Sequence, residues 1–122
     1  TSMALRPYVR RLIVAANALQ LEEENAVLAR VIFEVSNEWR MTPESILGRG
    51  RWQPLSLARQ SAIVLYRRVS GLGTRAVGQA FGGRDAGTVL HAETSIRNAL
   101  ETDPGFRARF DRCLIALQAP RP

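Results

Sequence analysis

Arginine offers the clearest chemistry in this sequence, because its planar guanidinium pairs with phosphate and with guanine. All 17 basic residues are arginines, against 11 acidic residues, and the formal net charge is +6. Residues 45–84 hold seven arginines and no acid, whereas residues 1–44 hold five arginines and six acids. Charge runs are usually solvated surfaces, but the absence of compensating acids here favours a polyanion site, on nucleic acid or an anionic membrane.

Other reactive residue types are scarce. His91 is the only histidine and Cys113 the only cysteine, which argues against a zinc site and against an internal disulfide. The chain has no lysine, so it cannot carry a phosphate-binding loop of the GxxxxGK[ST] type. No pair of acid, base or nucleophile lies at a spacing that would bring the two together for catalysis. We therefore expect no enzymatic activity, no cofactor and no metal. We predict that His91 is a packing residue in the VLHA sequence and that Cys113 is a small core residue.

The longest apolar run covers residues 12–16, which is far shorter than the roughly 20 residues of a membrane span. Acidic residues at positions 22–24 do not fit a secretory signal. We therefore expect no membrane partner and a cytoplasmic, nucleoid-associated location.

Helical periodicity predicts an all-α fold of six or seven helices. Apolar stripes cover residues 5–19 and 28–39 with no Pro or Gly between them, so one long helix and two joined helices both remain open. We divide the chain into an N-terminal helical extension, residues 1–25, and a domain, residues 26–122.

Cap residues divide the rest of the chain into helices. The expected caps are Thr42 before Pro43, Ser56 after a loop over residues 48–55, Thr74, Asp85, and Asp103 before Pro104. Gly71 and the pair Gly82-Gly83 are the expected helix stops. We expect Trp52, in the loop, to pack as an anchor, and contact with a sugar of the nucleic acid is the alternative.

The short helix after Thr74, the glycine turn and the longer helix after Asp85 have the outline of a helix-turn-helix. Arginines border these elements on both sides: Arg49, Arg51, Arg59, Arg67, Arg68, Arg75 and Arg84. In duplex DNA binding, arginines hold phosphates while the start of a helix presents side chains to base edges. The pattern therefore predicts a double-stranded DNA-binding protein.

Residues 80–92, AFGGRDAGTVLHA, resemble the signature of the C-terminal DNA-binding domain (domain IV) of the bacterial replication initiator DnaA. The usual core of that signature is GGRDH, then Ser or Thr, then TVLHA. The ARQ sequence at residues 58–60 and the short helix at residues 42–47 also resemble this family, so the resemblance covers about residues 26–118. It implies a DnaA domain IV or Trp-repressor-like helix-turn-helix fold and sequence-selective binding of duplex DNA.

The resemblance also implies roles for individual residues. Arg51 falls at the position of a minor-groove arginine, Thr74 begins a phosphate-contacting edge, and Asp85 and Thr88 fall on the recognition helix. The complete predicted DNA-binding set is Arg49, Arg51, Arg59, Gln60, Arg67, Thr74, Arg75, Arg84, Asp85, Ala86, Gly87 and Thr88.

Two departures from the family's pattern bear on function. Ala86 and Gly87 stand where the family has His and Ser or Thr, so two polar base contacts are missing. At about 1–3 kcal/mol each, this loss removes roughly 2–6 kcal/mol of preference for the family's usual site and predicts a different or looser target. The missing phosphate-binding loop implies a stand-alone or excised domain, as in small regulators of the gene transfer agent activator type.

Three functions remain open. The first is a transcriptional regulator, or the DNA-binding part of one. The second is a DNA-binding fragment of a replication initiator. The third is an adaptor that binds a protein partner through its N-terminal helices and basic face.

Overall fold

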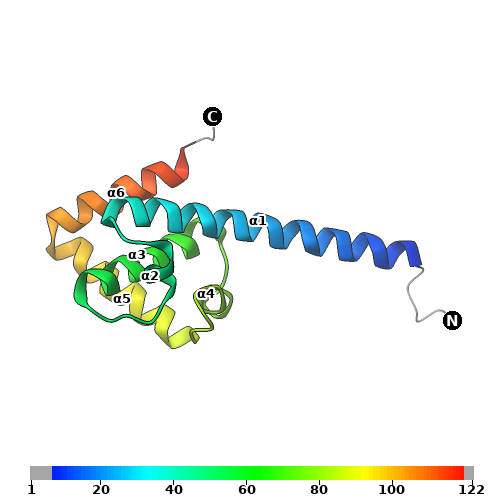
Figure 1. Ribbon diagram of the computed structural model, residues 1–122, viewed down its shortest axis with the longest axis horizontal. Coiled ribbons are helices and arrows are strands. Elements are labelled where there is room, and N and C mark those ends of the chain that lie inside the picture. The colour runs from blue at the N-terminus through cyan, green and yellow to red at the C-terminus, as the bar shows by residue number, and fades with distance from the viewer. Residues whose placement is uncertain (1–6, 120–122) are drawn as a thin grey trace.

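The computed structural model describes residues 7–119, and it describes side chains from residue 23 onward. This part of the chain forms six helices and no strand, which confirms the all-α prediction (Figure 1). The helices are α1 (Pro7–Trp39), α2 (Pro43–Leu47), α3 (Gln53–Ser70), α4 (Thr74–Ala80), α5 (Ala86–Thr102) and α6 (Pro104–Gln118). No helix among the described residues is long and apolar enough to cross a membrane.

Of the two alternatives left open by the sequence, the structure has the single long helix, α1. It has 33 residues, or about 50 Å at 1.5 Å per residue, and it runs through the proposed boundary at residue 25 without a break. Its C-terminal half packs on α3 and α6, and the helix extends past the rest of the domain toward its N-terminal end (Figure 1). The placement of the domain boundary remains a prediction.

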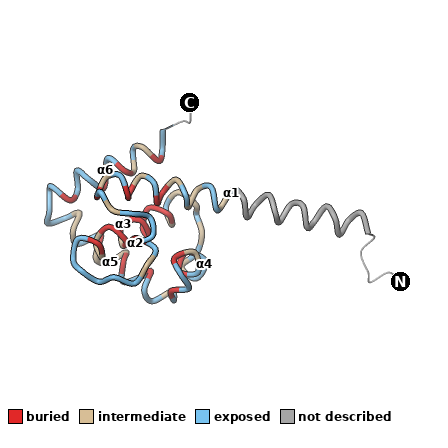
Figure 2. Tube along the Cα trace, viewed as in Figure 1, coloured by how far each residue is buried: buried red, intermediate tan, exposed pale blue. Residues whose placement is uncertain are grey.

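The core lies between the C-terminal half of α1, α3, α5 and α6 (Figure 2). Val31 and Val35 of α1 are fully buried, and Trp39 stacks near Phe106, with ring centroids 6.0 Å apart. Cys113 is buried, as predicted, and burial raises the pKa of its thiol to about 12. The apolar stripe read at residues 28–39 therefore marks the core-facing side of α1, whereas the stripe at residues 5–19 lies outside the residues whose side chains are described.

Helix starts follow the predicted caps at three positions. The side chains of Thr42, Asp85 and Asp103 accept from the backbone N–H groups of Ser45, Thr88 and Phe106. Gly71 ends α3 in the left-handed region, with φ 71°.

Two predicted caps are wrong. Ser56 lies inside α3, because Pro54 suits the first turn of a helix and α3 already begins at Gln53. Thr74 is the first residue of α4, and Gly73 takes the cap position without a side-chain hydrogen bond. The loop before α3 is therefore only residues 48–52.

A tight turn joins α4 to α5. Gly82 and Gly83 both have positive φ, 76° and 74°, which side chains with a Cβ rarely adopt. The Arg84 N–H donates to the Gly78 carbonyl at 2.9 Å, so the chain folds back onto α4. This close approach sets the angle between the two helices.

Gly78→Ala tests the importance of that approach. A Cβ at residue 78 would lie 2.2 Å from the Arg84 carbonyl oxygen, so backbone would have to move. We expect a loss of about 1–3 kcal/mol in the free energy of unfolding, measured by urea denaturation. Gly73→Ala is the control, because a Cβ there meets nothing within 4 Å. Equal stability of the two variants would contradict the prediction.

Candidate nucleic-acid interface

Arg59 is a buried arginine that satisfies the end of α2. Its Nε donates to the Ile46 carbonyl at 2.7 Å, and its two terminal nitrogens donate to the carbonyls of Ser45 and Gly50 at 2.8 Å each. The last carbonyls of any helix lack partners within the helix, and α2 has only five residues. Arg59 therefore holds α2 and the following loop against α3.

Arg84, in the turn between α4 and α5, also donates to carbonyls at the end of α2. Its guanidinium donates to the carbonyl of Gly48 at 2.5 Å, to that of Leu47 at 3.5 Å and to that of Phe81. Arg49 completes the link, because its Nη2 donates to the Gly82 carbonyl at 2.7 Å. We call Arg49, Arg59 and Arg84 the arginine clamp. The clamp joins the end of α2 to the turn between α4 and α5.

The arginines of the clamp donate to backbone carbonyls, and these hydrogen bonds do not neutralise their positive charge. Burial lowers the pKa of Arg59, and the positive charge of Arg49 lowers it further. Burial also lowers the pKa of Arg84, with added repulsion from Arg59 and Arg49. Because no described carboxylate forms a salt bridge with the clamp, its positive potential stays available to a bound anion.

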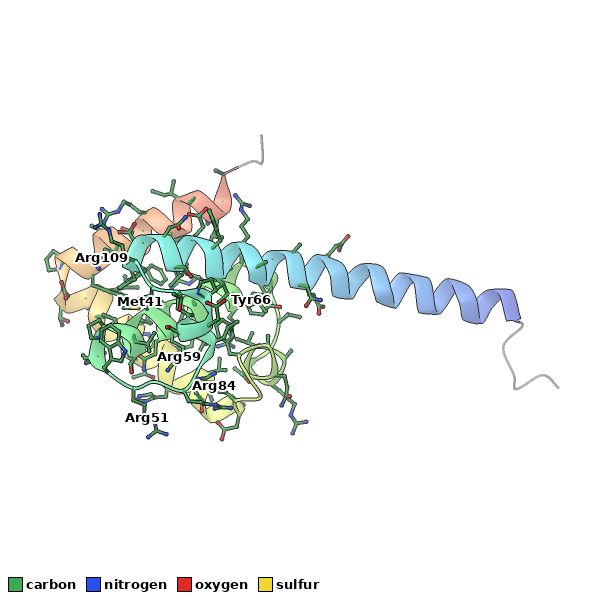
Figure 3. The ribbon with its side chains drawn as sticks, in the orientation of Figure 1. Met41, Arg51, Arg59, Tyr66, Arg84 and Arg109 are labelled. Carbon is green, nitrogen blue, oxygen red and sulfur yellow. The ribbon has the colours of Figure 1, made fainter. Side chains whose placement is uncertain are left out.

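A hollow of about 530 Å³ lies over the clamp, and polar or basic side chains line it. Its residues are Arg49, Arg51, Ser56, Arg59, Gln60, Arg84, Thr88 and His91. Arg51 is exposed and has no hydrogen-bond or salt-bridge partner among the described residues. Arg51, Arg59 and Arg84 lie on the side of the domain away from α1, as Figure 3 shows. Predicted residues from the loop, α3 and α5 thus meet at one surface.

The first turn of α5 forms one edge of this surface. Oδ1 of Asp85 accepts from the backbone N–H of Thr88 at 2.8 Å and from its hydroxyl at 3.0 Å. These hydrogen bonds lower the pKa of the Asp85 carboxyl. Gly87 is exposed and Ala86 half-buried, and both lie outside the clamp. The start of α5 is therefore accessible.

Some residues of the predicted DNA-binding set do not line the hollow. Arg67 pairs with Glu93 at 3.3 Å, and Thr74 and Arg75 begin α4. Arg75 is exposed and has no salt-bridge partner within residues 23–119. Arg68, which the sequence grouped with these arginines, lies over the Phe110 ring at 5.3 Å. The roles of Arg67, Thr74 and Arg75 in binding remain predictions.

Two expectations about single residues are wrong. His91 is exposed and lines the hollow, because the core-facing side of α5 passes through Val89 and Ala92 instead. Trp52 is 59% exposed beside Arg51 and does not anchor the loop. The arginine clamp holds the loop instead. The spacing of His91 three residues after Thr88, on one helix face, was the signal that could have found it.

Taken together, a short helix, a glycine turn and an accessible second helix beside a basic hollow define a protein of the DNA-binding helix-turn-helix class. The family model of the bacterial DnaA protein helix-turn-helix matches residues 28–96. The chain belongs to this family, and the resemblance seen in the sequence is confirmed.

Curated relatives agree with this family. Chromosomal replication initiator protein DnaA of Neisseria meningitidis serogroup C is 29% identical over 109 residues, covering 86% of this chain and 21% of that protein. The proteins of the same name from Corynebacterium jeikeium and Streptococcus thermophilus (strain LMD-9) are 37% and 38% identical, over 65% and 64% of this chain and 14% and 17% of theirs. The chain therefore spans about a fifth or less of these relatives' length.

Arg59→Met tests the clamp. The change leaves the carbonyls of Ser45, Ile46 and Gly50 without their donors, so we expect the free energy of unfolding to fall by roughly 3 kcal/mol or more in urea denaturation. Arg59→Lys should rescue little, because one ammonium cannot reproduce a three-point fork. Arg51→Ala serves as the exposed control and should change stability by less than about 0.5 kcal/mol. Similar stability of all three variants would contradict the structural role.

Proposed function

We propose that this chain binds double-stranded DNA selectively, with the hollow and the start of α5 as its binding surface. The observation that carries the proposal is the set of uncompensated arginines beside an accessible helix start, in a member of the DnaA helix-turn-helix family. A duplex offers phosphates to the positive hollow and base edges to the helix. His91 lines the same hollow, and Trp52 is exposed next to Arg51 in the loop.

In this arrangement the arginines divide into two groups. The clamp orients the loop and supplies positive potential, while Arg51 extends from the loop with a free guanidinium. Narrow minor grooves have a strong negative potential and attract such a side chain. At the same time, the first turn of α5 enters the major groove, where Thr88 and the backbone at Gly87 approach the bases.

We infer that the chain acts as a transcriptional regulator or as the DNA-binding part of one. Its lack of lysine excludes a P-loop lysine within these residues, so ATP-driven opening of an origin would need another part of a longer protein. A DNA-binding fragment of a replication initiator is the second candidate, favoured by the names of the relatives. Footprinting across a bacterial genome separates the two by showing binding at promoters or at an origin.

Arg51→Ala tests the binding surface. Titration of a duplex at several salt concentrations should give a log–log slope of several units for the wild type. For the variant we expect affinity lower by about 1–3 kcal/mol and a shallower slope, because a free guanidinium is lost.

Arg109→Ala is the matched control, since it removes the same charge from an exposed site on α6, at the opposite end of the domain in Figure 3. A flat salt response of the wild type would contradict DNA binding, and equal losses in both variants would contradict the role of Arg51. Retention of a protein partner at high salt without DNA binding would favour an adaptor.

Ala86→His with Gly87→Thr tests the cause of altered selectivity. A Cβ at residue 87 meets only Oδ1 of Asp85, at 3.4 Å, so the new side chain fits. The pair restores the family's polar residues, and we expect preference for the DNA site of DnaA over a scrambled duplex to rise by roughly 2–6 kcal/mol. Competition binding measures this preference, and an unchanged ratio would show that these positions do not read bases.

A further inference from the structure

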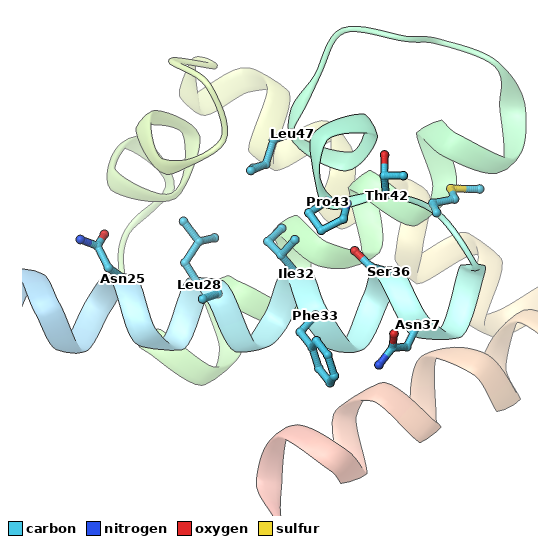
Figure 4. Close-up of a pocket in the computed structure, with 11 residues that line it drawn as sticks. Asn25, Leu28, Ile32, Phe33, Ser36, Asn37, Thr42, Pro43 and Leu47 are labelled. Atoms are coloured by element: carbon cyan, nitrogen blue, oxygen red, sulfur yellow. The ribbon is translucent and has the colours of Figure 1, made fainter.

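An apolar groove of about 710 Å³ runs between α1 and α2 (Figure 4), and none of its lining residues lines the basic hollow. Leu28, Ile32 and Phe33 of α1 line one wall, and Pro43 and Leu47 line the other. Phe33 is 59% exposed, which is unusual for a large apolar side chain on a helix whose neighbours are buried.

A buried polar atom also faces this groove. Ser36 is 7% exposed and lines the groove, and its hydroxyl is the one buried side-chain N or O atom without a hydrogen-bond partner among the described residues. Unpaired buried hydroxyls are costly. An occupant that brings a hydrogen-bonding group next to Ser36 would remove this cost.

The sequence of α1 continues the pattern of the groove toward its N-terminal end. Apolar residues recur every seven positions, at Leu12, Leu19, Ala26 and Phe33. A companion series follows at the three-residue offset, at Tyr8, Ala15, Ala29 and Ser36, interrupted by Glu22. Two series with this spacing are typical of a helix that pairs with another helix.

The charges of the chain specify the orientation of such a pair. Residues 1–21 carry three arginines and no acid, whereas residues 22–47 carry six acids and two arginines. Antiparallel pairing of two copies sets the basic segment of each against the acidic segment of the other. Parallel pairing would set like charges together along the whole length.

We propose that the groove receives the N-terminal half of α1 from a second copy of this chain, in an antiparallel two-fold pair. In a register centred on residue 22, position 12 lies opposite Ile32, position 15 opposite Ala29 and position 8 opposite Ser36. Tyr8 then brings a hydroxyl to the unpartnered Ser36, and alanine meets alanine at the middle position. Each copy fills the groove of the other, so the contact is closed and limited to two chains.

The dimer leaves the basic hollow free. Arg51 and Arg84 lie on the side of the domain away from α1 in Figure 3, so both copies keep an open binding surface. Glu22 of the two chains meets near the two-fold axis, and this repulsion weakens the pair. We expect dissociation at about micromolar concentration.

Sedimentation equilibrium of the full chain without DNA tests the proposal independently of the proposed function. From about 1 to about 200 μM, we expect the wild type to pass from monomer to dimer. Phe33→Arg should weaken the dimer about tenfold or more, because position 33 lies opposite Arg11 in this register and like charges repel. Leu90→Arg is the control, because Leu90 is 53% exposed on α5 and does not line the groove. A wild type that stays monomeric, or a dimer insensitive to Phe33→Arg, overturns the proposal.

Cysteine cross-linking tests the orientation. Under oxidation, a mixture of Ala15→Cys and Ala29→Cys chains should give a disulfide-linked pair, whereas each variant alone should not. The native Cys113 is buried, so its thiol should not interfere. Parallel pairing predicts the reverse result, cross-links in each variant alone, and this outcome overturns the antiparallel register.

Discussion

The donation of arginine N–H groups to backbone carbonyls at the end of α2 is the interaction on which the rest of this structure depends. A five-residue helix is not stable by itself, and its terminal carbonyls need donors. Arg59 of α3 supplies them on one side and Arg84 of the turn on the other. Because Arg84 also binds the Phe81 carbonyl, one set of hydrogen bonds fixes α2, the loop and the turn between α4 and α5.

This solution has an electrostatic consequence. Carbonyl dipoles satisfy the N–H groups of a guanidinium, but they do not neutralise its charge as a carboxylate would. The pKa values of Arg59 and Arg84 are lowered first by burial and second by repulsion from other arginines, which is Arg49 for Arg59 and both Arg59 and Arg49 for Arg84. The same residues that stabilise the fold therefore keep the hollow positive. Replacing the carbonyls by acids would have held the loop equally well and would have removed the attraction for phosphate.

The sequence predicts those features of the fold that depend on residues close together along the chain. The caps at Asp85 and Asp103 involve residues three positions apart, and the apolar stripes fix which sides of the helices are buried. The acceptors of Arg59 lie 9 to 14 residues away, and the Gly48 and Leu47 acceptors of Arg84 lie 36 and 37 residues away, so no local pattern shows them. For this reason both arginines read as surface cations in the sequence, although each is more than nine-tenths buried.

Errors at single residues have the same origin. Trp52 has a large apolar side chain of the kind that usually lies in a core. Its loop is held by hydrogen bonds, and the side chain stays exposed. His91 follows Leu90 in an apolar sequence, yet the buried side of α5 passes through Val89 and Ala92. Burial at residue 91 is decided by the rotation of the whole of α5, which the sequence of one turn does not determine.

The clamp also explains how the family's pattern can change at the start of α5 without damage to the fold. Ala86 and Gly87 make no side-chain hydrogen bond in the clamp, and the Asp85 cap holds the first turn without them. Stability and positive potential thus come from one set of residues, and the proposed base contacts from another. In the proposed binding mode, a chain that loses polar side chains at these two positions keeps its fold and its attraction for a duplex, while its selectivity depends more on Arg51 and on the shape of the groove. The proposed mode therefore lets the choice of target diverge faster than the affinity for DNA.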